Sequence, residues 1–350
     1  MSVNLAACVT SFLVSFIFLP VIIKYSLEKN LVDAPNRRKI HTKVTPSLGG
    51  IAIFVGFLIA SLIWMDFGQW HEIRYVLASL IIVFLLGVRD DLVPFRALHK
   101  LYGQIVAVII LLFSSIQISS LYGLFGVHEV PSFLGYIVTG FTIIIITNSF
   151  NLIDGLDGLA GSVGIVALTA FGIWFFWVGD TIFSLFSFAM MGGILAFLVF
   201  NWEPSEIFMG DTGAMVIGML LAILVIHFMS VNYHLPETHP AKFTAIIASA
   251  VSFIIIPLCD TLRIIILRIS KGQSPFKPDK SHIHHRLMRL GITHSRTSLI
   301  LASLNGIYIA GAFLFRQVGD RIMLPVVLIY SIALSVLLDI FIRRRKTLAK

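Results

Sequence analysis

The chain has 350 residues, of which 57% are hydrophobic and 13% are charged, and its mean hydropathy is +0.94. This composition excludes a soluble globular domain, and the net charge of +8 indicates basic loops near anionic lipid or an anionic substrate, with no role in nucleic-acid binding. Cys8 and Cys259 should lie near opposite faces of the membrane and form no Cys-x-x-Cys pair, so neither a disulfide nor a structural zinc site is expected.

Apolar runs long enough to cross roughly 30 Å of hydrocarbon as helices recur along the whole chain. There are eleven of them, near 3–23, 48–65, 75–88, 101–118, 134–150, 159–179, 181–200, 212–231, 243–262, 298–316 and 322–342. Backbone polar groups in lipid must be paired within the protein, so these runs predict an all-α integral membrane protein. We expect about eleven transmembrane helices in a single polytopic domain over residues 1–350.

The basic residues predict the orientation of these helices. If the N-terminus is outside and the spans alternate, 22 of the 26 Lys and Arg residues fall in cytoplasmic segments. Those segments are 24–43, 89–100, 263–296 and 343–350. Because membranes retain basic residues on the cytoplasmic side, we expect the N-terminus outside and the C-terminus inside.

Acidic residues gather at the predicted cytoplasmic ends of the spans. An ionisable group near hydrocarbon is costly unless it is paired or hydrated, so several together suggest a functional site. The first pair, Asp90 and Asp91, belongs to "GVRDDLVPFRALHKLYGQ" at 87–104. A solvated turn, in which Arg89 and Arg96 balance the two carboxylates, is the alternative for this segment.

A second acidic segment, "NSFNLIDGLDGLAG" at 148–161, follows directly on a very apolar run. Asp154 and Asp157 are three residues apart, so a helix starting here would place them on one face together with Asn151. The glycines would let a bulky ligand approach the backbone. Small-residue helix packing also explains the glycines, but it does not explain the aspartates.

A third segment, "IFMGDTGAM" at 207–215, places Asp211 just before the eighth predicted span. Capping of the helix N-terminus by Asp211 and Thr212 is the alternative role. A capping role does not preclude metal binding, so both interpretations stay open for Asp211.

The longest polar loop, "KGQSPFKPDKSHIHHRLMRLG" at 271–291, carries a histidine motif. It predicts a helix over 282–290 with Ser281 as the N-cap. One face of that helix would carry His282, His285 and Arg289. Because His284 would point elsewhere, a three-histidine zinc site on one helix is not favoured, and anion binding by His and Arg is the better interpretation.

Hard carboxylates for Mg²⁺, basic loops for phosphate and apolar grooves for lipid therefore share one membrane face. With "DAPNRRKIHTKVTPSLGG" at 33–50, the chain carries five motifs in order. They resemble the polyprenyl-phosphate N-acetylhexosamine-1-phosphate transferases, the WecA/TagO/MraY family (glycosyltransferase family 4), and most closely its WecA/TagO branch.

The resemblance implies transfer of a sugar 1-phosphate from a UDP-amino sugar to undecaprenyl phosphate, giving a lipid-diphosphate-sugar and UMP. It implies Mg²⁺ as cofactor, with Mn²⁺ as the alternative metal. It further implies a multi-pass protein in the lipid bilayer of the bacterial inner (cytoplasmic) membrane, with the active site facing the cytoplasm. Dimers occur in the family, so the resemblance also suggests a homodimer.

Carried over motif by motif, the resemblance assigns roles to individual residues. The catalytic set is Asp90, Asp91, Asp154, Asp157 and Lys100. The metal ligands are Asp211 and Asp154. The substrate-binding set is Asn151, His282, His284, His285, Arg286, Lys43 and Phe208. Pro94 stands where some members have a third acidic residue, which argues against a third carboxylate in that loop.

The chemistry leaves the role of Asp90 open. The attacking lipid phosphate is a monoester with a second pKa of about 6, so at neutral pH it is mostly deprotonated already. Asp90 is therefore expected as a general base or as a group that positions the lipid phosphate. Direct displacement is favoured over a covalent phospho-aspartate intermediate.

The donor is predicted from the branch that the chain resembles. The cell-wall branch carries three consecutive histidines followed by an aromatic and an acidic residue, whereas this chain has His284-His285-Arg286-Leu287. We expect UDP-N-acetylglucosamine, or a relative such as a 6-deoxy N-acetylhexosamine nucleotide, in a reaction that initiates a cell-envelope glycan such as lipopolysaccharide or teichoic acid. Transfer of phospho-N-acetylmuramoyl-pentapeptide is the alternative.

Two other classes of membrane protein fit the sequence less well. A secondary transporter would carry its ionisable residues near the bilayer midplane and would repeat its two halves. Here the acids gather at one face, and no repeat is found. An intramembrane metalloprotease would need a His-Glu-x-x-His pair, which the sequence does not contain.

Overall fold

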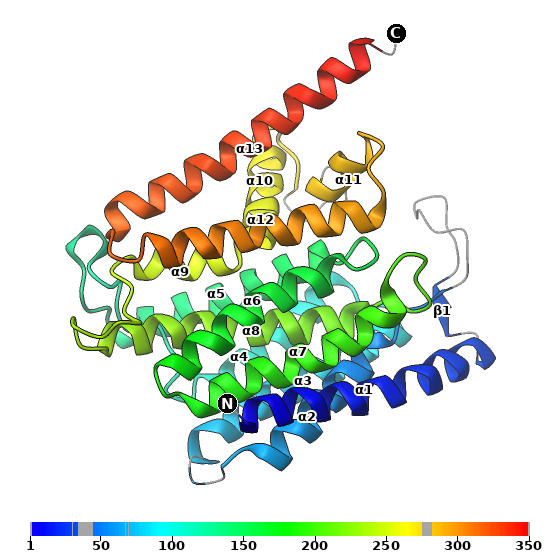
Figure 1. The fold of residues 1–350 in the computed structure, drawn as a ribbon, viewed down its shortest axis with the longest axis horizontal. Helices are drawn as coiled ribbons and strands as arrows, with labels where there is room; N and C mark the ends of the chain where they lie inside the picture. Colours follow the sequence, from blue (N-terminus) through cyan, green and yellow to red (C-terminus); the bar gives the residue numbers. More distant parts are fainter. Residues whose placement is uncertain are drawn as a thin grey trace.

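The structure, a computed structural model, is built almost entirely from helices and describes residues 2–29, 31–33, 45–66, 68, 70–274 and 282–348. The helices are α1 (Ser2–Glu28), α2 (Gly49–Trp64), α3 (Trp70–Leu92), α4 (Ala97–Leu111), η2 (Leu124–Gly126), α5 (Ser132–Ile153), α6 (Leu159–Trp177), α7 (Thr181–Asn201), α8 (Gly210–His234), α9 (Ile246–Phe253), α10 (Ile255–Ile269), α11 (Ile283–Met288), α12 (His294–Leu314) and α13 (Asp320–Leu348). Two short strands, β1 (Val32–Asp33) and β2 (Thr45–Pro46), pair in antiparallel fashion. Most of the long helices lie side by side in one bundle (Figure 1).

Within the described ranges, eight helices are long and apolar enough to cross a membrane: α1, α3, α5, α6, α7, α8, α12 and α13. Helices α9 and α10 together would make a ninth, bent crossing, and α2 and α4 are apolar but shorter, with 16 and 15 residues. Each of the eleven predicted runs coincides with one of these helices or with the bent pair. The all-α membrane fold is confirmed, whereas the number of spans and their orientation stay predictions.

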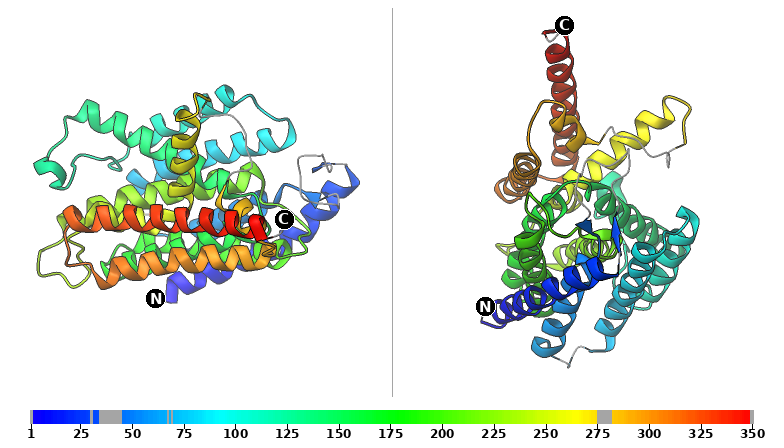
Figure 2. Two further views of the ribbon diagram at one scale, coloured as in Figure 1. Left: turned by 90° about the horizontal axis from the view of Figure 1, so that it is seen from above. Right: turned by 90° about the vertical axis from the view of Figure 1, so that its right-hand side faces the viewer.

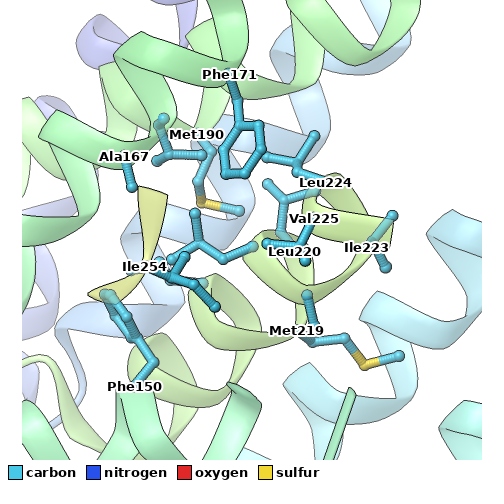
Figure 3. Packing of buried hydrophobic residues seen from close by; sticks show 14 of the residues in the cluster. Phe150, Ala167, Phe171, Met190, Met219, Leu220, Ile223, Leu224, Val225 and Ile254 are labelled. Atoms are coloured by element: carbon cyan, nitrogen blue, oxygen red, sulfur yellow. The ribbon is translucent and has the colours of Figure 1, made fainter. Parts of the chain in front are cut away.

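Helix α8 occupies the centre of the bundle, and 83% of its most apolar window is buried inside the protein. Helices α2, α3, α5, α6 and α9 pack against it. Figure 3 shows Leu220 and Leu224 of α8 in the same cluster as Phe150 of α5 and Phe171 of α6. Lipid tails are as apolar as leucine, so close packing rather than the hydrophobic effect must hold these helices together.

Two glycines let neighbouring helices approach the start of α8. A Cβ on Gly50 of α2 would lie 2.0 Å from the backbone nitrogen of Gly213, and a Cβ on Gly87 of α3 would lie 2.4 Å from Thr212 Cα. No side chain fits at such distances, and small residues are what close helix packing in membranes requires. These contacts fix the end of α8 that carries Asp211.

The apolar run predicted at 243–262 is divided between α9 and α10, which meet at a bend of 90°. Pro257, in the first turn of α10, has no N–H to donate to the carbonyl of Phe253, and its ring would clash with a continuing helix. Asn305 of α12 donates to that carbonyl instead, at 3.1 Å. The bend turns α10 away from the bundle, as the right-hand view of Figure 2 shows.

Candidate active site

Lys100 of α4 lies between the carboxylates of Asp90 on α3 and Asp211 on α8. Its Nζ is 3.2 Å from Asp90 Oδ2 and 2.5 Å from Asp211 Oδ1. Asn151, near the end of α5, donates through Nδ2 to the same Asp211 oxygen at 2.5 Å. Residues predicted from three separate motifs therefore meet at one point.

A pair of amides one helical turn away fixes α4 against α5. Gln104 Nε2 is 3.4 Å from Asn148 Oδ1, and Asn148 Nδ2 is 3.0 Å from Gln104 Oε1. Gln104 is buried, and breaking such a pair would leave polar groups unpaired in an apolar interior. The two amides thereby set the position of Lys100 relative to Asn151.

Asp91 caps the N-terminus of α8. Its Oδ1 accepts the backbone N–H of Asp211 at 2.7 Å, and its Oδ2 accepts the backbone N–H and the hydroxyl of Thr212 at 2.9 and 2.5 Å. Capping of this helix by Asp211 and Thr212 themselves was the alternative role that the sequence left open. The structure corrects that interpretation, because the cap comes from α3 and leaves the Asp211 carboxylate to face Lys100.

The solvated turn considered for the Asp90–Asp91 pair is also wrong. Arg89 donates to the carbonyl of Val93 at 2.8 Å, and its guanidinium carbon lies 5.1 Å from the centre of the Phe95 ring. Asp90 is buried and accepts the backbone N–H of Phe95 at 2.6 Å. Lys100, rather than Arg89, supplies the positive charge next to Asp90.

Asp154 lies in the loop between α5 and α6, as does Asp157, so the shared helix face that the sequence suggested for them does not form. Burial, followed by the nearby charges of Asp211 and Asp91, raises the pKa of Asp154 to about 8. Asp154 therefore holds its proton at neutral pH, partly because the carboxylates around it make the site negatively charged. A cation bound there would offset this charge.

Asp157 contacts a different part of the protein. Its Oδ2 is 3.4 Å from His294 Nδ1, and its backbone carbonyl accepts from Ser298 Oγ at 2.8 Å, both on α12. The adjacent Gly158 donates its N–H to Asn201 Oδ1 at 2.8 Å. Three of these contact residues were not predicted as site residues: His294, Ser298 and Asn201. The only feature of the sequence that could have indicated them is that they are polar and lie at the ends of apolar runs.

Helix α11 carries the histidine motif and confirms a helix within the predicted range 282–290, while the predicted N-cap Ser281 lies outside the described residues. The expectation that His284 points away from the other histidines is wrong. Its ring centroid lies 5.6 Å from that of His282 and 4.3 Å from that of His285. The three imidazoles form one group.

His284 connects this group to the aspartate loop. A Cβ on Gly155 would lie 2.9 Å from His284 Nε2, so the ring rests against the residue that follows Asp154. Burial, followed by the neighbouring His285, lowers the pKa of His284 to about 3, so this ring is neutral at physiological pH. Its Nδ1 is buried with no hydrogen-bond partner within the described part of the chain, and such an unpaired buried nitrogen is unusual enough to need an explanation.

Arg286, also predicted to bind substrate, contacts α13. Its guanidinium donates to the hydroxyl and the carbonyl of Ser335 at 3.0 and 2.8 Å and forms an ion pair with Asp339. Burial lowers its pKa, although the guanidinium stays charged. Two other residues were predicted to bind substrate. Phe208 donates its backbone N–H to the carbonyl of Pro46 in β2 at 2.7 Å. Lys43 lies outside the described residues.

Comparison with known proteins agrees with these motifs. Residues 73–229 match Glycosyl transferase family 4. An undecaprenyl-phosphate alpha-N-acetylglucosaminyl 1-phosphate transferase of Salmonella typhi is 31% identical over 314 residues, 88% of this chain and 82% of that protein. Proteins of the same name are 33% identical in Yersinia pestis (89% of this chain, 83% of that protein) and 31% identical in Escherichia coli strain K12 (85% and 79%). The chain belongs to glycosyl transferase family 4.

As a family 4 protein the chain is a transferase, and its apolar helices make it a multi-pass membrane protein. Enzymes of this family need a divalent metal ion. Among the residues that the structure describes, no three His, Cys, Asp or Glu side chains are grouped closely enough to hold a metal by themselves. Mg²⁺ usually takes one or two carboxylates, several waters and substrate phosphates, and Asp211 and Asp154 supply carboxylates of that kind. Oxygen ligands of this kind suit a divalent cation that is bound together with a phosphorylated substrate.

Proposed function

We propose that this protein transfers N-acetylglucosamine 1-phosphate from UDP-N-acetylglucosamine to undecaprenyl phosphate. The names of its relatives support both the sugar and the lipid acceptor. The structural observation that carries the proposal is the meeting of Asp90, Lys100, Asn151 and Asp211 beside the Asp154 loop. It gathers carboxylates, a cation and an amide where two phosphorylated substrates would react.

In the proposed reaction an oxygen of the lipid phosphate attacks the β-phosphorus of the UDP-sugar. The bond between this phosphorus and the oxygen that bridges to the α-phosphorus breaks, and UMP leaves with the electron pair. Both reactants are anions, so charge neutralisation and in-line positioning must supply most of the catalysis. The lipid phosphate is mostly deprotonated at neutral pH, so no side chain has to remove a proton first.

In this proposal each residue of the site has its own role in charge neutralisation or positioning. Lys100 Nζ, held between Asp90 and Asp211, is placed to bind a phosphate oxygen. Asp90 positions the lipid phosphate or accepts its last proton. Mg²⁺, held by Asp211 and Asp154, would neutralise the diphosphate and make UMP a better leaving group. The histidines of α11, of which His284 lies against Gly155 of the Asp154 loop, would contact the donor.

His284 suits the donor because its neutral ring carries a buried nitrogen with no partner among the described residues. A hydroxyl or N–H of the nucleotide-sugar would satisfy that nitrogen. Arg286 contributes indirectly in this proposal, since its contacts fasten α11 to α13. We place the site at the cytoplasmic face of a bacterial inner membrane, where UDP-sugars are available, and we propose a homodimer as the assembly.

The test is a transfer assay with purified protein, undecaprenyl phosphate, Mg²⁺ and a panel of radiolabelled UDP-sugars at equal concentration. We expect label in the lipid fraction from UDP-N-acetylglucosamine or a close N-acetylhexosamine relative, with one UMP released per lipid labelled. Faster turnover of the muramoyl-pentapeptide nucleotide would replace the proposed donor and keep the reaction class. Absence of lipid label from every nucleotide would reject the function itself.

A further inference from the structure

Asp260 is a buried carboxylate that the proposed reaction does not use. It lies on α10, just after the 90° bend, and is 5% exposed. Its Oδ1 accepts the backbone N–H of Ile283 at 2.9 Å and a guanidinium N–H of Arg263 at 3.0 Å. Its Oδ2 is 2.8 Å from Nδ1 of His282. One carboxylate therefore reaches from α10 to the first turn of α11.

These contacts decide which nitrogen of His282 is available to a ligand. A carboxylate oxygen can only accept a hydrogen bond, so Nδ1 of His282 must carry the proton in its contact with Asp260. Nε2 is then the nitrogen that a substrate can use. A carboxylate behind a histidine orients catalytic and metal-binding imidazoles in the same way.

The contact with Ile283 determines where α11 lies. The first N–H groups of a helix have no partner within the helix, and Asp260 satisfies one of them from another helix. Helix α11 has six residues, which is too short to be stable by itself. Its anchors therefore keep the ring of His284, stacked parallel to that of His282, against Gly155.

We propose that Asp260 is a positioning residue for the nucleotide-sugar donor. It orients His282 so that Nε2 faces the donor, and it keeps α11 beside the Asp154 loop. The inference rests on the proposed function in one respect, that the histidine helix binds the donor. It does not depend on which sugar is transferred.

A purely structural role for Asp260 is the competing explanation, and the chain offers a matched control. Asp320, at the start of α13, is also buried and accepts the backbone N–H groups of Ile247 and Ala248 of α9 at 3.0 and 2.7 Å. It is the first residue of α13, 19 residues before Asp339, the residue of this helix that pairs with Arg286 of α11. Asp320→Asn thus reports what the loss of a buried capping carboxylate does to stability alone.

The experiment compares Asp260→Asn with Asp320→Asn in the full-length protein. Asparagine at 260 can still accept the N–H of Ile283, but it presents either an amide N–H or a weaker acceptor to His282. We expect the Kd for UMP and the KM for UDP-N-acetylglucosamine to rise about tenfold, as for the loss of one charge-assisted hydrogen bond. The KM for undecaprenyl phosphate should stay within about twofold. Asp320→Asn should lower the Tm and leave both KM values unchanged.

A double-mutant cycle tests whether Asp260 acts through His282. In His282→Asn the amide nitrogen takes the place of Nδ1, so the bond to Asp260 is kept and Nε2 is lost. We expect this single variant to weaken UMP binding about tenfold, and adding Asp260→Asn should weaken it no further. Unchanged UMP binding in His282→Asn overturns the proposal even if Asp260→Asn fails to fold.

The remaining outcomes separate this inference from the proposed function. Equal increases in the KM values of donor and lipid, or additive losses in the double variant, would show that Asp260 is only structural. Equal affinity for UMP in the wild-type protein and in Asp260→Asn would reject the positioning role alone. Wild-type protein that neither binds UMP nor transfers label would instead reject the proposed function.

Discussion

The carboxylate of Asp91 accepts the backbone N–H of Asp211 at 2.7 Å, so one aspartate of the site caps the helix that carries another. Gly210, just before Asp211, has a φ of +73°, and a Cβ there would lie 2.0 Å from the carbonyl of Ser47 and 2.7 Å from Asp91 Oδ2. The tight turn therefore needs glycine. By contacting this turn, Asp91 of α3 and Ser47, which precedes α2, together fix the direction in which the Asp211 side chain points.

Because Asp91 caps α8 and Asp211 does not, mutations of these two aspartates should have different effects. Asp91→Ala leaves the N–H groups of Asp211 and Thr212 without their acceptor, and we expect a loss of about 1–2 kcal/mol in stability, which is the usual cost of removing a helix cap. Asp211→Asn keeps the cap and should leave the Tm nearly unchanged. Its turnover should fall by orders of magnitude, because charge stabilisation in the transition state is lost.

The measurements are thermal unfolding in detergent and transfer of labelled sugar, made on both variants. Asp91→Ala should lose stability and activity together. A Tm for Asp211→Asn that falls as far as that of Asp91→Ala would contradict the division of roles, as would near-normal activity of Asp211→Asn in limiting Mg²⁺.

The apolar helices and the chemical character of the site could be predicted because both are local properties of the sequence. Hydrophobic length locates helices such as α5 and α8, and Asp154 and Asp211 stand out as charges at the ends of apolar runs. The bend between α9 and α10 was missed because hydropathy does not register Pro257. Asn305, which donates to the free carbonyl of Phe253, is 52 residues away from it and can supply that substitute donor only after α12 has packed.

Contacts between helices were the part that the sequence could not provide. Asp91 and Thr212 are 121 residues apart, and nothing in either motif indicates that one caps the other. Asp154 and Asp157 looked equivalent as neighbours on one helix. The helix ends before both of them, so Asp154 lies near the charges of Asp211 and Asp91, whereas Asp157 contacts His294.

The raised pKa of Asp154 predicts a pH dependence of metal binding. Below a pH of about 8 the carboxyl holds a proton that a cation must displace. The apparent Kd for Mn²⁺ should therefore fall as pH rises, at most about tenfold per pH unit, and level off above that pKa. Electron paramagnetic resonance of free Mn²⁺ measures the Kd without any turnover. Asp154→Asn should bind weakly with a flat profile, and a wild-type profile equally flat between pH 6 and 8 would exclude Asp154 as a ligand.

The contact between Asp157 and His294 predicts a different outcome for that aspartate. Both side chains are largely buried, and Asp157 Oδ2 lies 3.4 Å from His294 Nδ1. We expect Asp157→Asn and His294→Gln each to destabilise the protein, with a coupling energy of about 1 kcal/mol in the double variant. The free energy of unfolding in mixed micelles measures this coupling. Additive losses would show that the two residues act independently, and a changed Mn²⁺ affinity in Asp157→Asn would instead make Asp157 a metal ligand.

The last prediction concerns the orientation in the membrane. The segment after α4 and the link from α8 to α9 lie at one end of the bundle, whereas β1 and α11 lie at the other (Figure 1). Since 22 of 26 basic residues fall in segments that should share the end of α11, this end should face the cytoplasm. A reporter fused after residue 127 or 235 should therefore behave as external, and one fused after residue 275 or 350 as cytoplasmic. Opposite signals at 127 and 235 would contradict the packing of the helices. Cytoplasmic signals at both positions, with external signals at 275 and 350, would agree with the packing but would show that the protein has the opposite orientation in the membrane. The site would then lie away from the cytoplasmic pool of UDP-sugars.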